Sequence, residues 1–159
     1  MRKTQLFGLA TLIAALAMLA TGMNRVVADD KDHEKHGGHS MKCAKACSAC
    51  QMECAMCFDH CVKLVAAGKK DHAATVRTCA DCSQVCALAA SLTANNSPMA
   101  VPVCEACAKC CDGCAAACEK FKEDKHMAGC AKACRDCAKE CREMIKHAGH
   151  DHKDHKEGK

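Results

Sequence analysis

The sequence predicts an all-α fold, an antiparallel up-down-up-down four-helix bundle whose core is lined with cysteine. The chain of 159 residues contains 19 cysteines, nearly all of them three or four residues apart within separate runs. This spacing places the thiols along one side of a helix, where a bundle helix normally carries Leu or Ile. Alanine, lysine and glutamate fill the other positions, and no segment alternates as a strand would.

The first cysteine run predicts a helix over residues 41–67. At about 100° per residue, its thiols fall within a stripe roughly 80° wide. They are Cys43, Cys47, Cys50, Cys54, Cys57 and Cys61. Gly68 and the two lysines that follow it are expected to end the helix.

The second run predicts a helix from Asp71, which is able to cap it, to Ala94. Its thiols are Cys79, Cys82 and Cys86. The segment 95–98, with the sequence Asn-Asn-Ser-Pro, is expected to break this helix. Because the connections are short, neighbouring helices should run antiparallel.

The third helix is expected to begin within residues 99–102, since Pro102 suits a first turn, and to end near Lys122. Its thiols are Cys104, Cys107, Cys110, Cys111, Cys114 and Cys118. Cys110 lies about 80° from the centre of this stripe, so it is the least suited of them to face the core. The fourth helix is expected over residues 124–147. Its thiols are Cys130, Cys134, Cys137 and Cys141.

Residues 1–28 have the pattern of a cleaved export signal. Arg2 and Lys3 precede an apolar stretch that is short for a membrane anchor, and Ala28 suits cleavage. Only one arginine is present where a twin-arginine signal needs two, which favours the general secretory route. We therefore expect an exported, periplasmic or extracytoplasmic protein that has no membrane anchor after cleavage.

A bundle domain over residues 41–148 is predicted to lie between two flexible His-rich tails, 29–40 and 149–159. The tail and near-tail histidines are His33, His36, His39, His147, His150, His152 and His155. Imidazoles at neutral pH are able to capture Cu(II), Zn or Ni, whereas a solvated tail without a metal role is equally compatible with the composition.

Charge and aromatic content argue against nucleic acid as a partner. Cleavage after residue 28 removes three cations and no acid, so the formal net charge falls from +4 to +1. The remaining chain has no Trp or Tyr, and its only aromatic residues of the Phe, Trp and Tyr class are Phe58 and Phe121. A basic surface and base-stacking platforms are both missing. Aliphatic side chains are also scarce, so thiols, or something bound to them, must fill the core.

Three uses of so many thiols remain open from the pattern alone. Disulfides suit an exported protein, but cysteines three or four apart on one helix hold their Cβ atoms about 5–6 Å apart, too far for a bridge. Zinc in an all-cysteine site would leave two buried negative charges per ion. One Cu(I) per thiolate leaves an uncharged core, and thiolates are soft ligands that select Cu(I). The pattern therefore favours many Cu(I) ions per chain.

Two further thiol chemistries fit less well. Cys104, Cys107, Cys110 and Cys114 match the spacing of an iron–sulfur motif, but Ala115 follows where bacterial ferredoxins have Pro. A thiol oxidoreductase needs one distinguished reactive pair in a βαβ setting, and the sequence predicts neither. We therefore expect no enzymatic activity.

The cysteine pattern over residues 41–147 resembles that of the bacterial copper storage proteins, four-helix bundles lined with C-x2-C and C-x3-C cysteines and filled with Cu(I). The resemblance implies Cu(I) held by two thiolates, or by thiolate and imidazole, with His and Met residues admitting metal at one bundle end. It also implies a homo-oligomer, which the outward-facing Met52 and Met56 would permit. This sequence departs from the exported branch in lacking a clear twin-arginine signal.

The candidate metal ligands are all 19 cysteines together with His72, His126 and Met127. These last three lie near the thiol stripes at the end that the first and third loops share, although ordinary loop and cap roles stay open for them. His60 is about 100° off its stripe and is a weaker candidate. The expected function is storage, sequestration or detoxification of copper, with copper-delivering or copper-receiving proteins as further partners. A zinc buffer of metallothionein type and a disulfide-stapled module are the alternatives.

Overall fold

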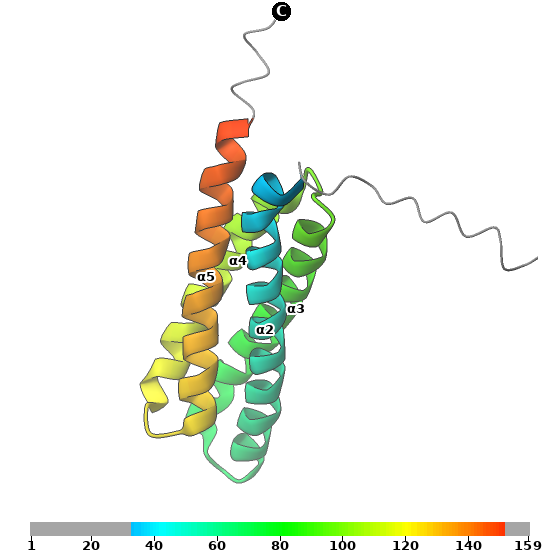
Figure 1. Cartoon of the computed structure of the whole chain (residues 1–159). Coiled ribbons are helices and arrows are strands. Elements are labelled where there is room, and N and C mark those ends of the chain that lie inside the picture. Colours follow the sequence, from blue (N-terminus) through cyan, green and yellow to red (C-terminus); the bar gives the residue numbers. More distant parts are fainter. Residues whose placement is uncertain (1–32, 152–159) are drawn as a thin grey trace, which may run out of the picture. The chain divides into compact units, whose positions relative to one another are not determined.

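The computed structural model describes the backbone of residues 33–151 and the side chains of residues 38–148, and it confirms the predicted four-helix bundle (Figure 1). The helices are α2 (His33–Ala66), α3 (Ala73–Ala94), α4 (Ala100–Cys118) and α5 (Lys125–Asp151), with the 3-10 turns η1 (Lys70–His72) and η2 (Glu119–Phe121). Short loops join successive helices, which run up and down in turn. None of the described residues is in a strand.

The outer helices extend further than expected. α2 begins at His33, so residues 33–40 are helical and not a flexible tail, and α5 continues to Asp151 beyond the predicted end at His147. Adding a residue to an existing helix is cheap compared with nucleating one, so a helix anchored in a bundle propagates through a polar segment. The export signal, residues 29–32 and residues 152–159 lie outside the described part of the chain.

The first loop ends α2 by backbone geometry. Gly68 has φ 89°, a left-handed conformation that glycine adopts without a Cβ penalty. The Gly68 N–H donates to the Val65 carbonyl (2.9 Å), and the Lys69 N–H donates to the Leu64 carbonyl (3.0 Å), which satisfies carbonyls at the helix end. The prediction that Asp71 caps the second helix is wrong. Asp71 lies inside η1, and α3 begins at Ala73 without a side-chain cap.

The other loops follow the sequence more closely. Pro102 occupies the first turn of α4, as expected, whereas α4 ends at Cys118 and passes into η2 before Lys122. Asp124 caps α5: its Oδ1 accepts from the backbone N–H groups of His126 (2.9 Å) and Met127 (3.3 Å). This cap fixes the start of α5 beside the core.

Cysteine takes the place of the usual aliphatic core. The largest side chains that are almost fully buried are Met127, Thr75 and Thr93, and cysteines follow them in size. Several other large apolar side chains are exposed, among them Met52 (63%) and Met56 (48%). The central space between the helices is therefore lined by sulfur.

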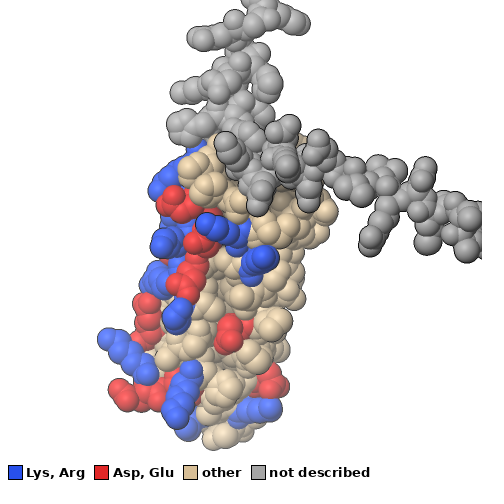
Figure 2. Space-filling model, viewed as in Figure 1, with Lys and Arg blue, Asp and Glu red and all other residues tan. Residues whose placement is uncertain are grey.

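Charged side chains cluster over one part of the surface. In the view of Figure 2, Lys, Arg, Asp and Glu lie mostly toward the side of α5, and the face over α2 and α3 is largely uncharged. Arg135 pairs with both Asp112 and Glu119, which ties α5 to the α4 side of the bundle. Among the described helices, none has the length and hydropathy needed to cross a membrane.

Candidate metal centre

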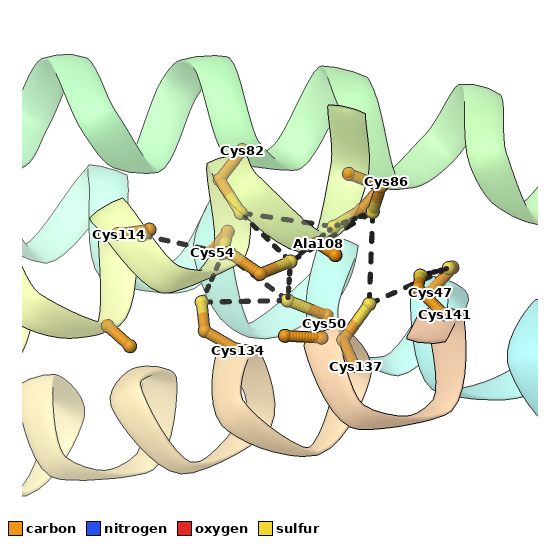
Figure 3. Close-up of a cluster of buried hydrophobic side chains, with 14 of the residues drawn as sticks. Cys47, Cys50, Cys54, Cys82, Cys86, Ala108, Cys114, Cys134, Cys137 and Cys141 are labelled. Carbon is orange, nitrogen blue, oxygen red and sulfur yellow. Dashed lines mark hydrogen bonds between the residues drawn. The ribbon is translucent and has the colours of Figure 1, made fainter. Parts of the chain in front are cut away.

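The structure buries every predicted thiol ligand except Cys110, which is half-buried, and all 19 cysteines are free thiols. This agrees with the helical angle of Cys110, which places it off the thiol stripe of α4. The other cysteines are buried, and those labelled in Figure 3 come from all four helices and point toward one another in the centre. The core is therefore one continuous body of thiols that no disulfide interrupts.

The thiols of α2 and α5 meet in a repeating unit, which we call a thiol triad: two cysteines four apart on one helix and one on its neighbour. In the first, Cys43 lies 3.9 Å from Cys47, and both sulfurs lie 3.6 Å from that of Cys141. In the second, one heptad further along α2, Cys50 and Cys54 are 3.8 Å apart and each is 3.6 Å from Cys134. The repeat arises because α2 and α5 are antiparallel, so a step of seven residues forward along α2 meets a step of seven residues backward along α5.

A third unit of the same geometry ends the α2–α5 column, with methionine in place of the third cysteine. Cys57 and Cys61 are 3.9 Å apart, and the Met127 Sδ lies 3.5 Å from the Cys57 sulfur and 3.8 Å from the Cys61 sulfur. Met127 is fully buried. This predicted ligand therefore lies directly against two core thiols.

The α3–α4 pair builds a second column. Cys82 and Cys86 are 3.9 Å apart, and each lies 3.6 Å from Cys111, which gives a further complete triad. One heptad toward either end of α3, this column loses thiols: Thr75 and Thr93 stand at cysteine positions and are buried. Thr93 Oγ1 contacts the Cys104 sulfur at 3.3 Å. The triad with two cysteines on α3 therefore lies in the middle of the bundle, whereas Cys79 alone represents α3 against Cys114 and Cys118 (3.7 and 4.0 Å).

The two columns are in contact across the bundle. α2 and α4 run parallel, and sulfurs on them that are 61 residues apart in sequence face each other at 3.7–4.0 Å. The pairs are Cys43 and Cys104, Cys50 and Cys111, and Cys57 and Cys118. Groups of four thiols also lie within 4.8 Å of one another, one of them made by Cys47, Cys107, Cys137 and Cys141. A soft metal ion bound to thiols of one column therefore has thiols of the other column close by as further donors.

The core carries no fixed charge. Among the described residues, the only buried polar side chains are His72, Thr75 and Thr93, and no Lys, Arg, Asp or Glu is buried. Burial raises the pKa of Cys61 and of Cys110 from 9.0 to about 12. These thiols are therefore protonated at neutral pH, and a bound metal ion must displace their protons.

The bundle end at which the α2–α3 loop meets the α4–α5 loop, which we call the Met127 end, holds the other predicted ligands. His72 is buried and stacks on Phe121, with ring centroids 4.0 Å apart, and its Nδ1 has no hydrogen-bond partner. A cavity of about 390 Å³ opens beside both rings. His126 is exposed and does not face the thiols. The structure thus brings Met127 to the thiols and leaves His126 outside them.

Two side chains outside the predicted ligand set, His60 and Met144, lie at the two ends of the thiol core. His60, which its helical angle made a weaker candidate, donates a 2.7 Å hydrogen bond from Nε2 to Asp124 Oδ2 and stacks against His126. Met144 is buried on α5 at the opposite end, beyond the Cys141 triad. The sequence signal for Met144 was its place on the thiol face of the fourth helix, whereas the approach of His60 to Asp124 depends on how two helices pair.

Comparison with known proteins supports the same kind of site. The sequence model of the copper storage protein family matches residues 15–146. The uncharacterized cysteine-rich protein YhjQ of Bacillus subtilis (strain 168) is 34% identical over 96 residues, which is 60% of this chain and 85% of YhjQ.

Solved structures share the fold. The Cu(I)-bound copper storage protein BsCsp3 is 32% identical and superposes with a TM-score of 0.61 over 67% of this chain and 98% of its own. A cytosolic copper storage protein from Streptomyces lividans, in a structure of copper loading with five coppers, is 28% identical with a TM-score of 0.62 over 70% and 95% of the two chains. A family match across most of a chain whose thiols line a four-helix core leads to one assignment: the chain belongs to the copper storage protein family.

Proposed function

We propose that this protein stores many Cu(I) ions on the cysteine thiolates inside its four-helix bundle. The observation that carries the proposal is the uncharged thiol core, in which sulfurs from all four helices lie 3.6–4.0 Å from their neighbours. Each Cu(I) replaces one thiol proton, so filling the core adds no net charge. Storage in this form binds and releases an ion and needs no catalytic step.

Charge separates Cu(I) from zinc as the cargo. A zinc ion held by four thiolates leaves two negative charges, and the described core contains no cation to neutralise them. Cu(I) with one thiolate per ion is neutral, and soft sulfur donors select it. The Cu(I)-bound relative with the same fold supports this choice.

Cu(I) is taken up, in this proposal, at the Met127 end. Met127 is a neutral donor that contacts both Cys57 and Cys61, so an ion can pass from its thioether to two thiolates without leaving sulfur. His72, whose buried Nδ1 lacks a partner, supplies a nitrogen donor at this end. His126 and His60 lie further out, where they meet incoming copper first.

The proposal is tested by anaerobic titration of the reduced, metal-free protein with Cu(I) against a coloured chelator. We expect a count in the teens, roughly one ion for each buried thiol. A count of a few ions, with zinc competing well, would support the metallothionein-type buffer instead. The disulfide-stapled alternative predicts almost no free thiol in protein isolated without reductant, which a thiol-reactive dye measures directly.

Export to the periplasm is the location that the N-terminal sequence favours. The basic Arg2 and Lys3, the short apolar stretch and Ala28 support cleavage and release, although the Streptomyces relative is described as cytosolic. Cell fractionation with intact-mass measurement tests this. A chain that lacks residues 1–28 in the periplasmic fraction is expected, and a full-length chain in the cytosol would overturn it.

Self-association is proposed through the uncharged face of α2. Met52 and Met56 are exposed on this helix, and Met41 and Val62 add 47% and 40% exposed apolar side chains. Apolar surface of this kind is typical of protein interfaces. Light scattering after size exclusion is expected to give a multiple of the monomer mass, and a Met52→Lys, Met56→Lys variant should give the monomer. A monomer mass for the unsubstituted protein would refute self-association.

Proteins that deliver or receive copper are the other proposed partners.

A further inference from the structure

The complete thiol triads offer a donor set that Cu(I) storage does not require in full: three neutral thiols that meet at one point. Their members are Cys43, Cys47 and Cys141; Cys50, Cys54 and Cys134; and Cys82, Cys86 and Cys111. Within each triad, all three sulfur–sulfur distances lie between 3.6 and 3.9 Å. One atom placed above such a triangle is able to bond all three sulfurs. These three triads share no residue, although the Cys50 and Cys111 sulfurs of two of them lie 3.8 Å apart. Cys86, Cys107 and Cys111 form a further triangle, with sides of 3.6–4.0 Å, that shares two thiols with the last triad and so adds no separate site.

We propose that each complete thiol triad also binds one trivalent arsenic or antimony centre, taken from its neutral trihydroxide. For arsenous acid, three As–O bonds break and three As–S bonds form. Each thiol proton leaves with one hydroxide as water, so three water molecules are released per arsenic. The arsenic stays trivalent and no sulfur is oxidised, so the exchange needs no oxidant or reductant.

The electrostatics of the core favour this product. An arsenic trithiolate is neutral, like the three thiols that it replaces. A divalent ion on the same three thiolates would leave one negative charge, and the described core contains no Lys or Arg to balance it. The core therefore selects cargo by the charge of the filled site. Monovalent ions with one thiolate each satisfy that criterion, and on a site of three thiols a trivalent centre satisfies it while using every donor.

Met127 separates these two classes at the third unit of the α2–α5 column. This unit has triad geometry, with the Met127 Sδ at 3.5 and 3.8 Å from the two cysteine sulfurs. A thioether has no proton to give up, so it cannot form the third covalent As–S bond, although it remains a donor for Cu(I). Replacing Met127 by cysteine completes a fourth triad and should create one new arsenic site.

The test counts arsenic in the reduced, metal-free protein incubated anaerobically with excess sodium arsenite. Native mass spectrometry gives the number bound, and a thiol-reactive dye gives the number of thiols lost, expected at three per arsenic. We expect at least three arsenic centres in the unsubstituted chain. Met127→Cys should bind one more, and Cys134→Ala should bind one fewer.

A matched control adds a thiol outside any triad. Met52 is exposed on the same bundle, so Met52→Cys should leave the arsenic count unchanged. An equal rise in Met52→Cys and Met127→Cys, or no rise in either, would overturn the proposal. Binding only in denaturant would also overturn it, because the triads exist only in the fold. If Cys134→Ala loses its helical circular dichroism, Cys141→Ala tests another triad in the same way.

The proposal rests on the reduced, folded thiol core of the proposed storage function and not on copper itself. A parallel Cu(I) titration of the same samples keeps the two apart. Retained Cu(I) capacity with no arsenic bound refutes the triad proposal alone, whereas loss of Cu(I) capacity in folded protein refutes the storage function.

Discussion

Removing one complete triad should reduce copper capacity by a defined number of ions. Cys50, Cys54 and Cys134 are all fully buried, and their sulfurs lie 3.6–3.8 Å apart. If each thiolate accounts for one Cu(I), the triple substitution to alanine should lower the capacity by about three ions. The triad lies in the middle of the α2–α5 column, so the loss reports on the core and not on the Met127 end.

The same substitution should also destabilise the apo protein to a limited extent. Each change removes one buried sulfur, comparable in size to a methylene group, whose burial contributes about 0.8 kcal/mol. The free energy of unfolding should therefore fall by roughly 2–3 kcal/mol for the three sites together. Helical circular dichroism before and after melting shows whether the variant still folds, which is required before its copper count is interpreted.

The assay is an anaerobic Cu(I) titration of the reduced variant against a coloured chelator. A Met52→Leu, Met56→Leu variant is the matched control, because it removes two sulfurs from α2 that are exposed and point away from the thiols. The control should keep the full capacity. An unchanged capacity in the folded triple alanine variant would refute the claim that the buried stripe is the store.

Three further outcomes follow from the same geometry. Met127→Leu keeps the size of the side chain but removes the thioether that contacts Cys57 and Cys61. Stopped-flow Cu(I) loading should therefore slow, while the titrated Cu(I) capacity falls by no more than about one ion. Equal loading rates would exclude Met127 from Cu(I) uptake. If each Cu(I) displaces one thiol proton, a pH-stat at neutral pH should record about one proton released per Cu(I) bound. Release of far fewer protons would mean that the thiols are already ionised. Cys61 and Cys110, whose pKa values are raised to about 12, keep their protons in the folded apo protein at pH values where the unfolded chain, with thiol pKa values near 9.0, releases them. The stability of the apo protein should therefore be full below that pH and decline toward about pH 12. The copper-loaded protein should lose less stability over this range, and identical melting curves for both forms would contradict this.

The helix number, the up-down order and the inward face of each helix were predictable, because cysteine spacing records the same face that an aliphatic stripe would. The angle of Cys110 on its helix correctly placed it at the margin. The start of α2 at His33 was not predictable from composition, since a polar His- and Gly-containing segment becomes helical only when the bundle below it supplies the nucleus.

Register between helices was the main part of the site that the sequence could not give. Met127 was predicted as a flanking ligand, but its role as the third member of a Cys57 and Cys61 unit depends on how α5 is set against α2. The same register brings His60 to Asp124 and leaves His126 outside. Asp71 was assigned as a cap because local sequence does not show that a 3-10 turn precedes α3.

The most direct test of copper storage is anomalous diffraction at the copper edge from crystals of the anaerobically Cu(I)-loaded protein. The proposed function predicts a row of copper peaks along the bundle axis, each within bonding distance of at least two sulfurs, from the Cys43 level to the Cys61 level. Copper peaks confined to surface histidines or to the ends of the chain, with the central thiols empty, would contradict it.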